Sequence, residues 1–174
     1  MAKYTEISLE NLGASPFKMI GKDWMLICPP DASKESGINA MTASWGGVGV
    51  LWHKNVCTLY VRPQRYTYSL CEENNTFSVC FPPEEFRDAM KLCGTKSGRD
   101  MDKIKECNMS VSECDGVKYI DGSSVVFICK KLYADNIKKE CFKCWFVIEN
   151  VGCLNAFSYS KVILCHLVCK YNFK

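Results

Sequence analysis

The hydrophobic positions of the chain fall in short runs, rich in β-branched and aromatic residues, that turn-forming residues separate. Runs of this length and composition are typical of β-strands. Two of them stop at consecutive prolines, Pro29-Pro30 and Pro82-Pro83, which cannot continue a sheet. The runs predict strands over Trp24–Cys28, Ile38–Ser44, Cys57–Val61, Thr76–Phe81, Val117–Ile120 and Ser124–Tyr133. The last two flank Asp121-Gly122, a dipeptide that favours a tight hairpin turn.

Two segments show helical spacing instead. The first begins at Pro83, where a proline and two glutamates suit a first turn, and ends at Gly94. Its apolar face consists of Phe86, Ala89, Met90 and Cys93. The second begins near Arg99 and continues through Ile104. The many short strands and few helices predict a mostly β fold, a small barrel with helices packed outside it.

The composition is that of an ordinary globular protein, with 174 residues of which 48% are hydrophobic and 24% charged. This length fits a single domain over residues 1–174. The net charge of +3 is too small to favour a nucleic acid or a lipid surface as a partner. No apolar run approaches the roughly 18 residues of a membrane span, and residues 1–10 do not resemble a secretory leader. We therefore expect a cytoplasmic protein.

Cysteine is unusually frequent, with 13 in the chain. The number is odd, and Cys57, Cys80 and Cys129 each lie singly inside an apolar run. Small disulfide-rich domains place their cysteines in loops instead. The pattern predicts reduced thiols in the interior of an intracellular domain.

Three segments carry candidate chemistry, and each also has an ordinary structural explanation. In residues 39–49, small hydroxylated residues precede a tryptophan and three glycines, which suits either a ligand close to the backbone or a bulged strand with a flexible turn. In residues 60–67, Arg62 and Arg65 flank a proline and suit either a phosphate group or a solvated turn. In residues 94–103, glycines, hydroxyls and charges lead into a helix, as an anion site or as a capped loop.

In this order and spacing, the three segments resemble the flavin reductase-like family, which includes the flavoredoxin-type proteins. The motifs are Met-Thr-Ala-Ser-Trp-Gly at 41–46, Tyr-Val-Arg-Pro-Gln-Arg-Tyr-Thr at 60–67 and Gly-Thr-Lys-Ser-Gly-Arg-Asp-Met-Asp-Lys-Ile at 94–104. The resemblance covers about Pro16 to Tyr133. It implies the FMN-binding split β-barrel and a homodimer with a flavin site near each side of the subunit interface.

The resemblance also implies which residues surround the cofactor FMN. The residues lining the isoalloxazine ring and ribityl chain would be Met41, Thr42, Ala43, Ser44 and Trp45. Those around the phosphate and ribityl chain would be Arg62, Gln64, Arg65, Tyr66 and Thr67. Those closing the site, in the same subunit or from its partner, would be Ser97, Gly98, Arg99 and Lys103. We expect Asp100 and Asp102 to have structural roles.

The function implied by the resemblance is electron transfer through a bound flavin. NAD(P)H would be the co-substrate, delivering a hydride to the flavin, or a redox protein partner would supply the electrons. No catalytic side chain is required, because the cofactor carries out the chemistry. The sequence leaves open an oxidoreductase, an electron carrier, and a non-catalytic ligand-binding module on the same barrel.

Residues 141–174 are atypical of the family. Relatives usually end with an Asp-Tyr-His motif and a strand reading Tyr-Ile-Gly-Glu-Ile, and this sequence has neither. The final barrel strand is therefore in question. The cysteines of this segment also suggest a zinc or iron–sulfur site, or small apolar residues on buried strands, and we assign no metal site. They are Cys141, Cys144, Cys165 and Cys169.

Overall fold

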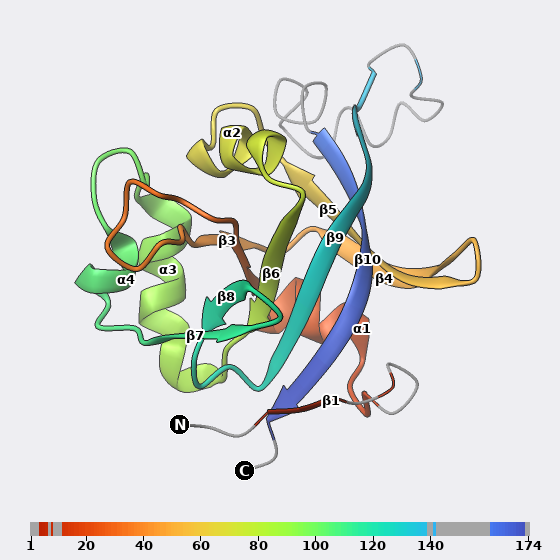
Figure 1. Ribbon diagram of the computed structural model, residues 1–174, viewed down its shortest axis with the longest axis horizontal. Helices are drawn as coiled ribbons and strands as arrows, with labels where there is room; N and C mark the ends of the chain where they lie inside the picture. Colours follow the sequence, from red (N-terminus) through yellow and green to blue (C-terminus); the bar gives the residue numbers. More distant parts are fainter. Residues whose placement is uncertain (1–3, 7, 9–11, 139–140, 142–160, 173–174) are drawn as a thin grey trace.

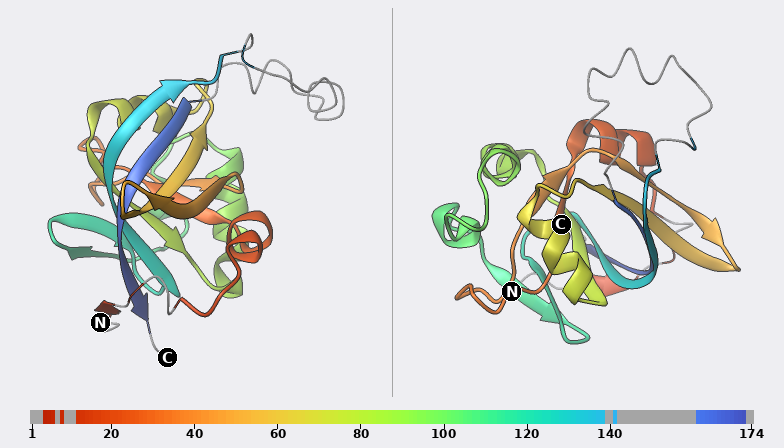
Figure 2. Two further views of the ribbon diagram at one scale, coloured as in Figure 1. Left: turned by 90° about the vertical axis from the view of Figure 1, so that its right-hand side faces the viewer. Right: turned by 90° about the horizontal axis from the view of Figure 1, so that it is seen from above.

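A curled antiparallel β-sheet forms a half-barrel around which the few helices are arranged (Figures 1 and 2). The computed structural model describes residues 4–6, 8, 12–138, 141 and 161–172, with the backbone alone for 4–6 and 168–172. The strand order is β3-β2-β6-β9-β10-β5-β4, with β1 paired to β10. These strands are β1 (Tyr4–Glu6), β2 (Met25–Cys28), β3 (Met41–Ala43), β4 (Gly46–Leu51), β5 (Lys54–Val61), β6 (Thr76–Phe81), β9 (Val125–Asn136) and β10 (Lys161–Asn172). A separate two-stranded sheet joins β7 (Val111–Cys114) to β8 (Val117–Ile120).

The helices are short and lie outside the curled sheet. They are α1 (Pro16–Lys18), which continues into the π-helical turn η2 (Met19–Asp23), α2 (Tyr66–Glu73), the 3₁₀ turn η3 (Glu84–Phe86), α3 (Arg87–Thr95) and α4 (Lys103–Glu106). Helices α3 and α4 lie with the β7–β8 pair on one side of the sheet (Figure 1). No helix among the described residues is both long enough and apolar enough to cross a membrane.

Two hydrophobic cores lie on opposite faces of the central strands. On β2, Met25 and Ile27 point into the barrel core, while Leu26 and Cys28 point into a second core that α3, α4 and the β7–β8 pair cover. Strands β6 and β9 alternate in the same way. A strand buried on both faces is apolar at every position, which explains the uninterrupted runs in the sequence.

The predicted hairpin at Asp121-Gly122 is wrong. Strand β8 pairs with β7 through the turn at Asp115-Gly116, and β9 pairs with β6 and β10 instead. Asp115 (φ 53°) and Gly116 (φ 74°) both have the positive φ that a two-residue hairpin turn requires. After Gly122, the backbone N–H of Ser124 donates to the Phe81 carbonyl, so the chain is directed onto β6.

The boundaries of other elements also differ from the prediction. Only Met41–Ala43 of the strand expected over Ile38–Ser44 forms a ladder, while Ile38 makes an isolated bridge to Pro30. The helix expected from Arg99 begins at Lys103, because the Asp102 carboxylate accepts hydrogen bonds from the first-turn N–H groups and caps it there. Strands β4 and β7 and helix α2 were not predicted.

The C-terminal segment does contain a barrel strand, although the family's usual ending is missing. Strand β10 lies between β9 and β5; it pairs with β9 over most of its length and with β5 over its first half. Its residues Ile163, Cys165 and Leu167 are buried in the barrel core. Cys165 lies directly opposite Cys57 of β5.

Candidate functional site

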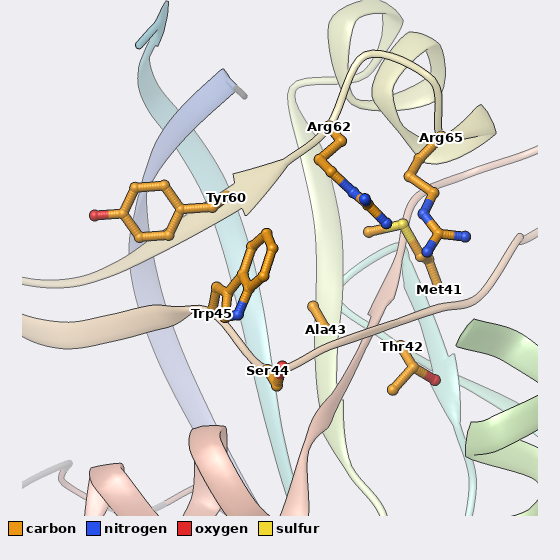
Figure 3. Close-up of a pocket in the computed structure, with 8 residues that line it drawn as sticks. All are labelled: Met41, Thr42, Ala43, Ser44, Trp45, Tyr60, Arg62 and Arg65. Atoms are coloured by element: carbon orange, nitrogen blue, oxygen red, sulfur yellow. The ribbon is translucent and has the colours of Figure 1, made fainter. Parts of the chain in front are cut away.

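A pocket opens where the chain passes from β3 to β4, beside the end of β5. Its cavity has a volume of about 140 Å³. Two arginines extend into it from the turn after β5, facing the β3–β4 backbone (Figure 3). Its lining residues are Met41, Thr42, Ala43, Ser44, Trp45, Tyr60, Arg62 and Arg65.

Strand β4 packs closely on β5 directly after the segment that lines the pocket. A β-carbon on Gly46 would collide with the backbone oxygen of Thr58 and crowd Met25, so only glycine allows this approach. The approach carries Ser44 and Trp45 to the rim, where the indole of Trp45 stays exposed. The wall therefore offers a ligand a backbone segment, a hydroxyl and an aromatic surface.

The turn after β5 gives the pocket its positive charge. The backbone N–H of Arg65 donates to the Arg62 carbonyl at 3.0 Å, which closes a turn around Pro63. Burial, together with the neighbouring charge of Arg62, lowers the pKa of Arg65. Within the described part of the chain, no carboxylate forms an ion pair with either guanidinium. Two like charges held together without a counter-ion form a site for an anion.

The C-terminal half of α3 anchors the pocket from behind. The Thr42 hydroxyl donates to the carbonyl of Met90, and Arg65 Nη1 donates to the carbonyl of Gly94 at 2.9 Å. The last carbonyls of a helix have no partner within the helix, and they attract cations. The guanidinium of Arg65 is therefore oriented by the helix end as well as by its own turn.

The structure brings seven of the predicted cofactor residues together on the pocket wall: Met41, Thr42, Ala43, Ser44, Trp45, Arg62 and Arg65. The other seven are not lining residues of this cavity: Gln64, Tyr66, Thr67, Ser97, Gly98, Arg99 and Lys103. The interactions of this second group form a layer behind and beside the pocket.

Several contacts hold this second layer in place. The buried Thr67 hydroxyl accepts a hydrogen bond from Asn39 Nδ2 at 2.9 Å. The guanidinium of Arg99 lies 5.1 Å from the ring centroid of Tyr66, the first residue of α2. Gly98 fits where a β-carbon would collide with Asn39 and Tyr66. The segment around Gly98 is thereby packed tightly against the start of α2.

Tyr60 lines the pocket and was not predicted as a site residue. On β5, Leu59 and Val61 point into the barrel core, so the intervening Tyr60 points out of it. The sequence does contain a signal for Tyr60. Side chains alternate along the predicted strand Cys57–Val61, which puts Tyr60 on the outward face two residues before Arg62.

Among the described residues, the structure gives no support to a metal site in the C-terminal segment. No cluster of potential metal ligands occurs among the described residues. Cys141 is exposed, whereas Cys165 is buried in the barrel core. Cys144 and the side chain of Cys169 lie outside the described residues.

These features define a class of protein: a half-barrel with an arginine-lined pocket between strands β3 and β4. The sequence profile of the flavin reductase like domain matches residues 26–148, and the chain belongs to this family. The match extends beyond Tyr133 and includes residues 141–148 of the atypical C-terminal segment. Family membership gives the chain a flavin-related function with a flavin cofactor. No curated protein sequence matches it significantly.

Solved structures with this fold include flavoredoxins and other split-barrel proteins. The flavoredoxin of Methanosarcina acetivorans is similar at a TM-score of 0.65 and 18% identity, over 87% of this chain and 68% of that one. An FMN-binding domain of flavin reductase-like enzymes from Shewanella baltica is similar at a TM-score of 0.68 and 13% identity, over 98% of this chain and 78% of that one. The flavoredoxin of Desulfovibrio vulgaris is similar at a TM-score of 0.65 and 15% identity, over 87% of this chain and 69% of that one. The predicted mostly β split barrel is confirmed.

Proposed function

We propose that the chain binds FMN at the arginine-lined pocket and transfers electrons through it. The observation that carries this proposal is the pair Arg62 and Arg65, which converge on one cavity without a carboxylate partner among the described residues. A phosphate group suits two guanidinium groups, because its oxygens can accept bidentate hydrogen bonds from both. The phosphate of FMN distinguishes it from riboflavin, so the arginines favour the mononucleotide.

The remaining wall fits the rest of this cofactor. The Ser44 hydroxyl and the β3–β4 backbone suit the polar ribityl chain, and the exposed indole of Trp45 suits a flat aromatic ring. When bound, FMN would supply two-electron hydride chemistry, and the protein would bind and orient it. We propose NAD(P)H or a redox protein as the electron donor, in keeping with the family.

We further propose that the site is completed in a homodimer. Pockets that bury a whole cofactor have volumes of about 300–1,000 Å³, whereas this cavity has about 140 Å³. One chain therefore encloses only part of FMN. Apolar side chains are also exposed near the tip of the β4–β5 hairpin, with Val50 at 73% and Trp52 at 67% exposure, and a second copy would cover them.

We place the protein in the cytoplasm because of its thiols. Cys28, Cys57, Cys71, Cys80 and Cys129 are buried as free cysteines in strands and helices, not paired in loops. A reducing compartment keeps thiols in this state.

The experiment that tests the proposed function is an absorption spectrum of the purified protein after addition of FMN and gel filtration. Flavin bands that co-elute with the protein, together with NADH or NADPH oxidation dependent on added FMN, are the expected result. Flavin binding without any electron transfer from NADH, NADPH or a reduced redox protein would indicate the non-catalytic binding module. A protein that retains no flavin would overturn the proposal.

A further inference from the structure

The ammonium group of Lys103 is buried behind the pocket in an unusual environment. Its side chain belongs to α4, and the residue is only 4% exposed. Nζ donates to two backbone carbonyls, that of Cys93 at 3.1 Å and that of Lys96 at 3.4 Å. No carboxylate pairs with it within the described ranges of the chain. A buried cation without a counter-ion is costly, so its presence requires a reason.

The two carbonyls that Lys103 binds lie on either side of Gly94. The carbonyl of Gly94 is the group that accepts the hydrogen bond from Arg65. Lys103 therefore fixes the backbone of residues 93–96, and this backbone orients the arginine in the pocket. The chain of contacts runs from the ammonium, through the last turn of α3, to the guanidinium.

The charge of Lys103 also acts on the pocket. Burial lowers the pKa of Lys103, and the positive charge of Arg65 lowers it further, so the two cations repel each other. The thiols of Cys93 on α3, Cys28 on β2 and Cys107 after α4 also face the ammonium, and burial raises the pKa of all three. An anion bound at Arg65 would relieve this repulsion and stabilise the protonated lysine.

We propose that Lys103 is a positioning residue of the anion site, which orients Arg65 through the end of α3 and adds positive charge without contacting the ligand. This inference rests on the proposed FMN function and goes beyond it, because it gives Lys103 a different role from the cofactor contact that the family resemblance implies. It predicts that Lys103 affects the phosphate end of the cofactor selectively.

The test compares the affinities of FMN and riboflavin, which share the ring and the ribityl chain and differ only in the phosphate. Lys103→Met is expected to weaken FMN binding about five- to tenfold while changing riboflavin binding less than about twofold. The matched control is Lys105→Met on the same short helix. Lys105 is exposed and pairs with Glu35, so its removal should leave both affinities unchanged.

The possible outcomes separate this inference from the proposed function. A wild-type protein that binds neither flavin, or binds both equally, overturns the phosphate site and the inference with it. A wild-type protein that prefers FMN, with the same preference retained in Lys103→Met, overturns only the role of Lys103. Equal losses of FMN and riboflavin affinity would assign Lys103 a purely structural role and would also overturn the inference.

A measurement on the wild-type protein decides the question if Lys103→Met does not fold. Titration calorimetry in two buffers of different ionisation enthalpy gives the protons taken up on binding. At a pH below the ordinary lysine pKa, where the phosphate is already a dianion, FMN should bind with greater proton uptake than riboflavin, because burial lowers the pKa of Lys103 and the bound phosphate would favour its protonated form. Burial raises the pKa of the three neighbouring thiols, so their own titration is shifted to higher pH. Equal proton uptake for both flavins contradicts the inference.

Discussion

Replacing Arg65 by alanine tests the electrostatic basis of the site. A hydrogen bond between charged partners contributes about 1.5–3 kcal/mol. Arg65 is only half-buried, so solvent screens part of its charge, and we expect a loss in the lower part of that range, about 1.5–2 kcal/mol. This corresponds to FMN binding about ten- to thirtyfold weaker. Riboflavin binding should change little, because riboflavin has no phosphate.

The assay is a fluorescence titration of each flavin with wild type, Arg65→Ala and the control Arg87→Ala. The control removes the same charge from α3, where Arg87 pairs with Glu84 and lies over the ring of Trp24, away from the pocket. It should leave the FMN affinity unchanged. Full FMN affinity in Arg65→Ala, or an equal loss in both variants, would refute a phosphate site built on this arginine.

Three further predictions concern stability, each measured by chemical denaturation. Gly98→Ala should lower the free energy of unfolding by about 1–3 kcal/mol, because a β-carbon at this position has no room. The control Gly47→Ala, at a position with open space around it, should change the free energy of unfolding far less. Similar effects of the two substitutions would contradict the tight packing at Gly98. Replacing His53, which has a positive φ in the β4–β5 turn, by glycine should raise the free energy of unfolding by about 1 kcal/mol, and a loss would contradict the turn assignment. Burial raises the pKa of the Cys71 thiol to about 12, so the contribution of this thiol to stability should be constant below about pH 8.5 and should fall above it by about 1.4 kcal/mol per pH unit. The free energy of unfolding of Cys71→Ala should fall less steeply with rising pH than that of the wild type, and an identical slope would refute the linkage.

The parts of the fold that the sequence predicts well are those whose hydrophobic pattern is strong by itself. Strands β2, β6 and β8 agree with their predicted runs to within one residue. Strand β4 was not predicted because three of its six residues, Gly46 to Leu51, are glycines, which leave little pattern. The β7–β8 hairpin was not predicted because two Asp-Gly dipeptides compete, and only the pairing partner of β8 decides between them.

The candidate site shows the same division between local and tertiary information. The residues that one motif places along β3 and its exit, Met41 to Trp45, line a single pocket with the two arginines. The position of Lys103 could not be predicted, because its burial depends on how α4 packs against the end of α3, far beyond the span of any motif. Motif spacing identifies residues near a ligand, while tertiary packing decides which of them form the cavity wall.

The central position of β10 has a consequence for how the protein folds. Lys161 pairs with Val61 of β5, a separation of 100 residues, so the two strands meet only after a long loop closes. Until then, both β5 and β9 present an unpaired edge to which other chains can add. Fragments that end before β10 should therefore aggregate rather than fold. Once inserted, β10 pairs with both β5 and β9 and removes these two edges as sites for strand addition.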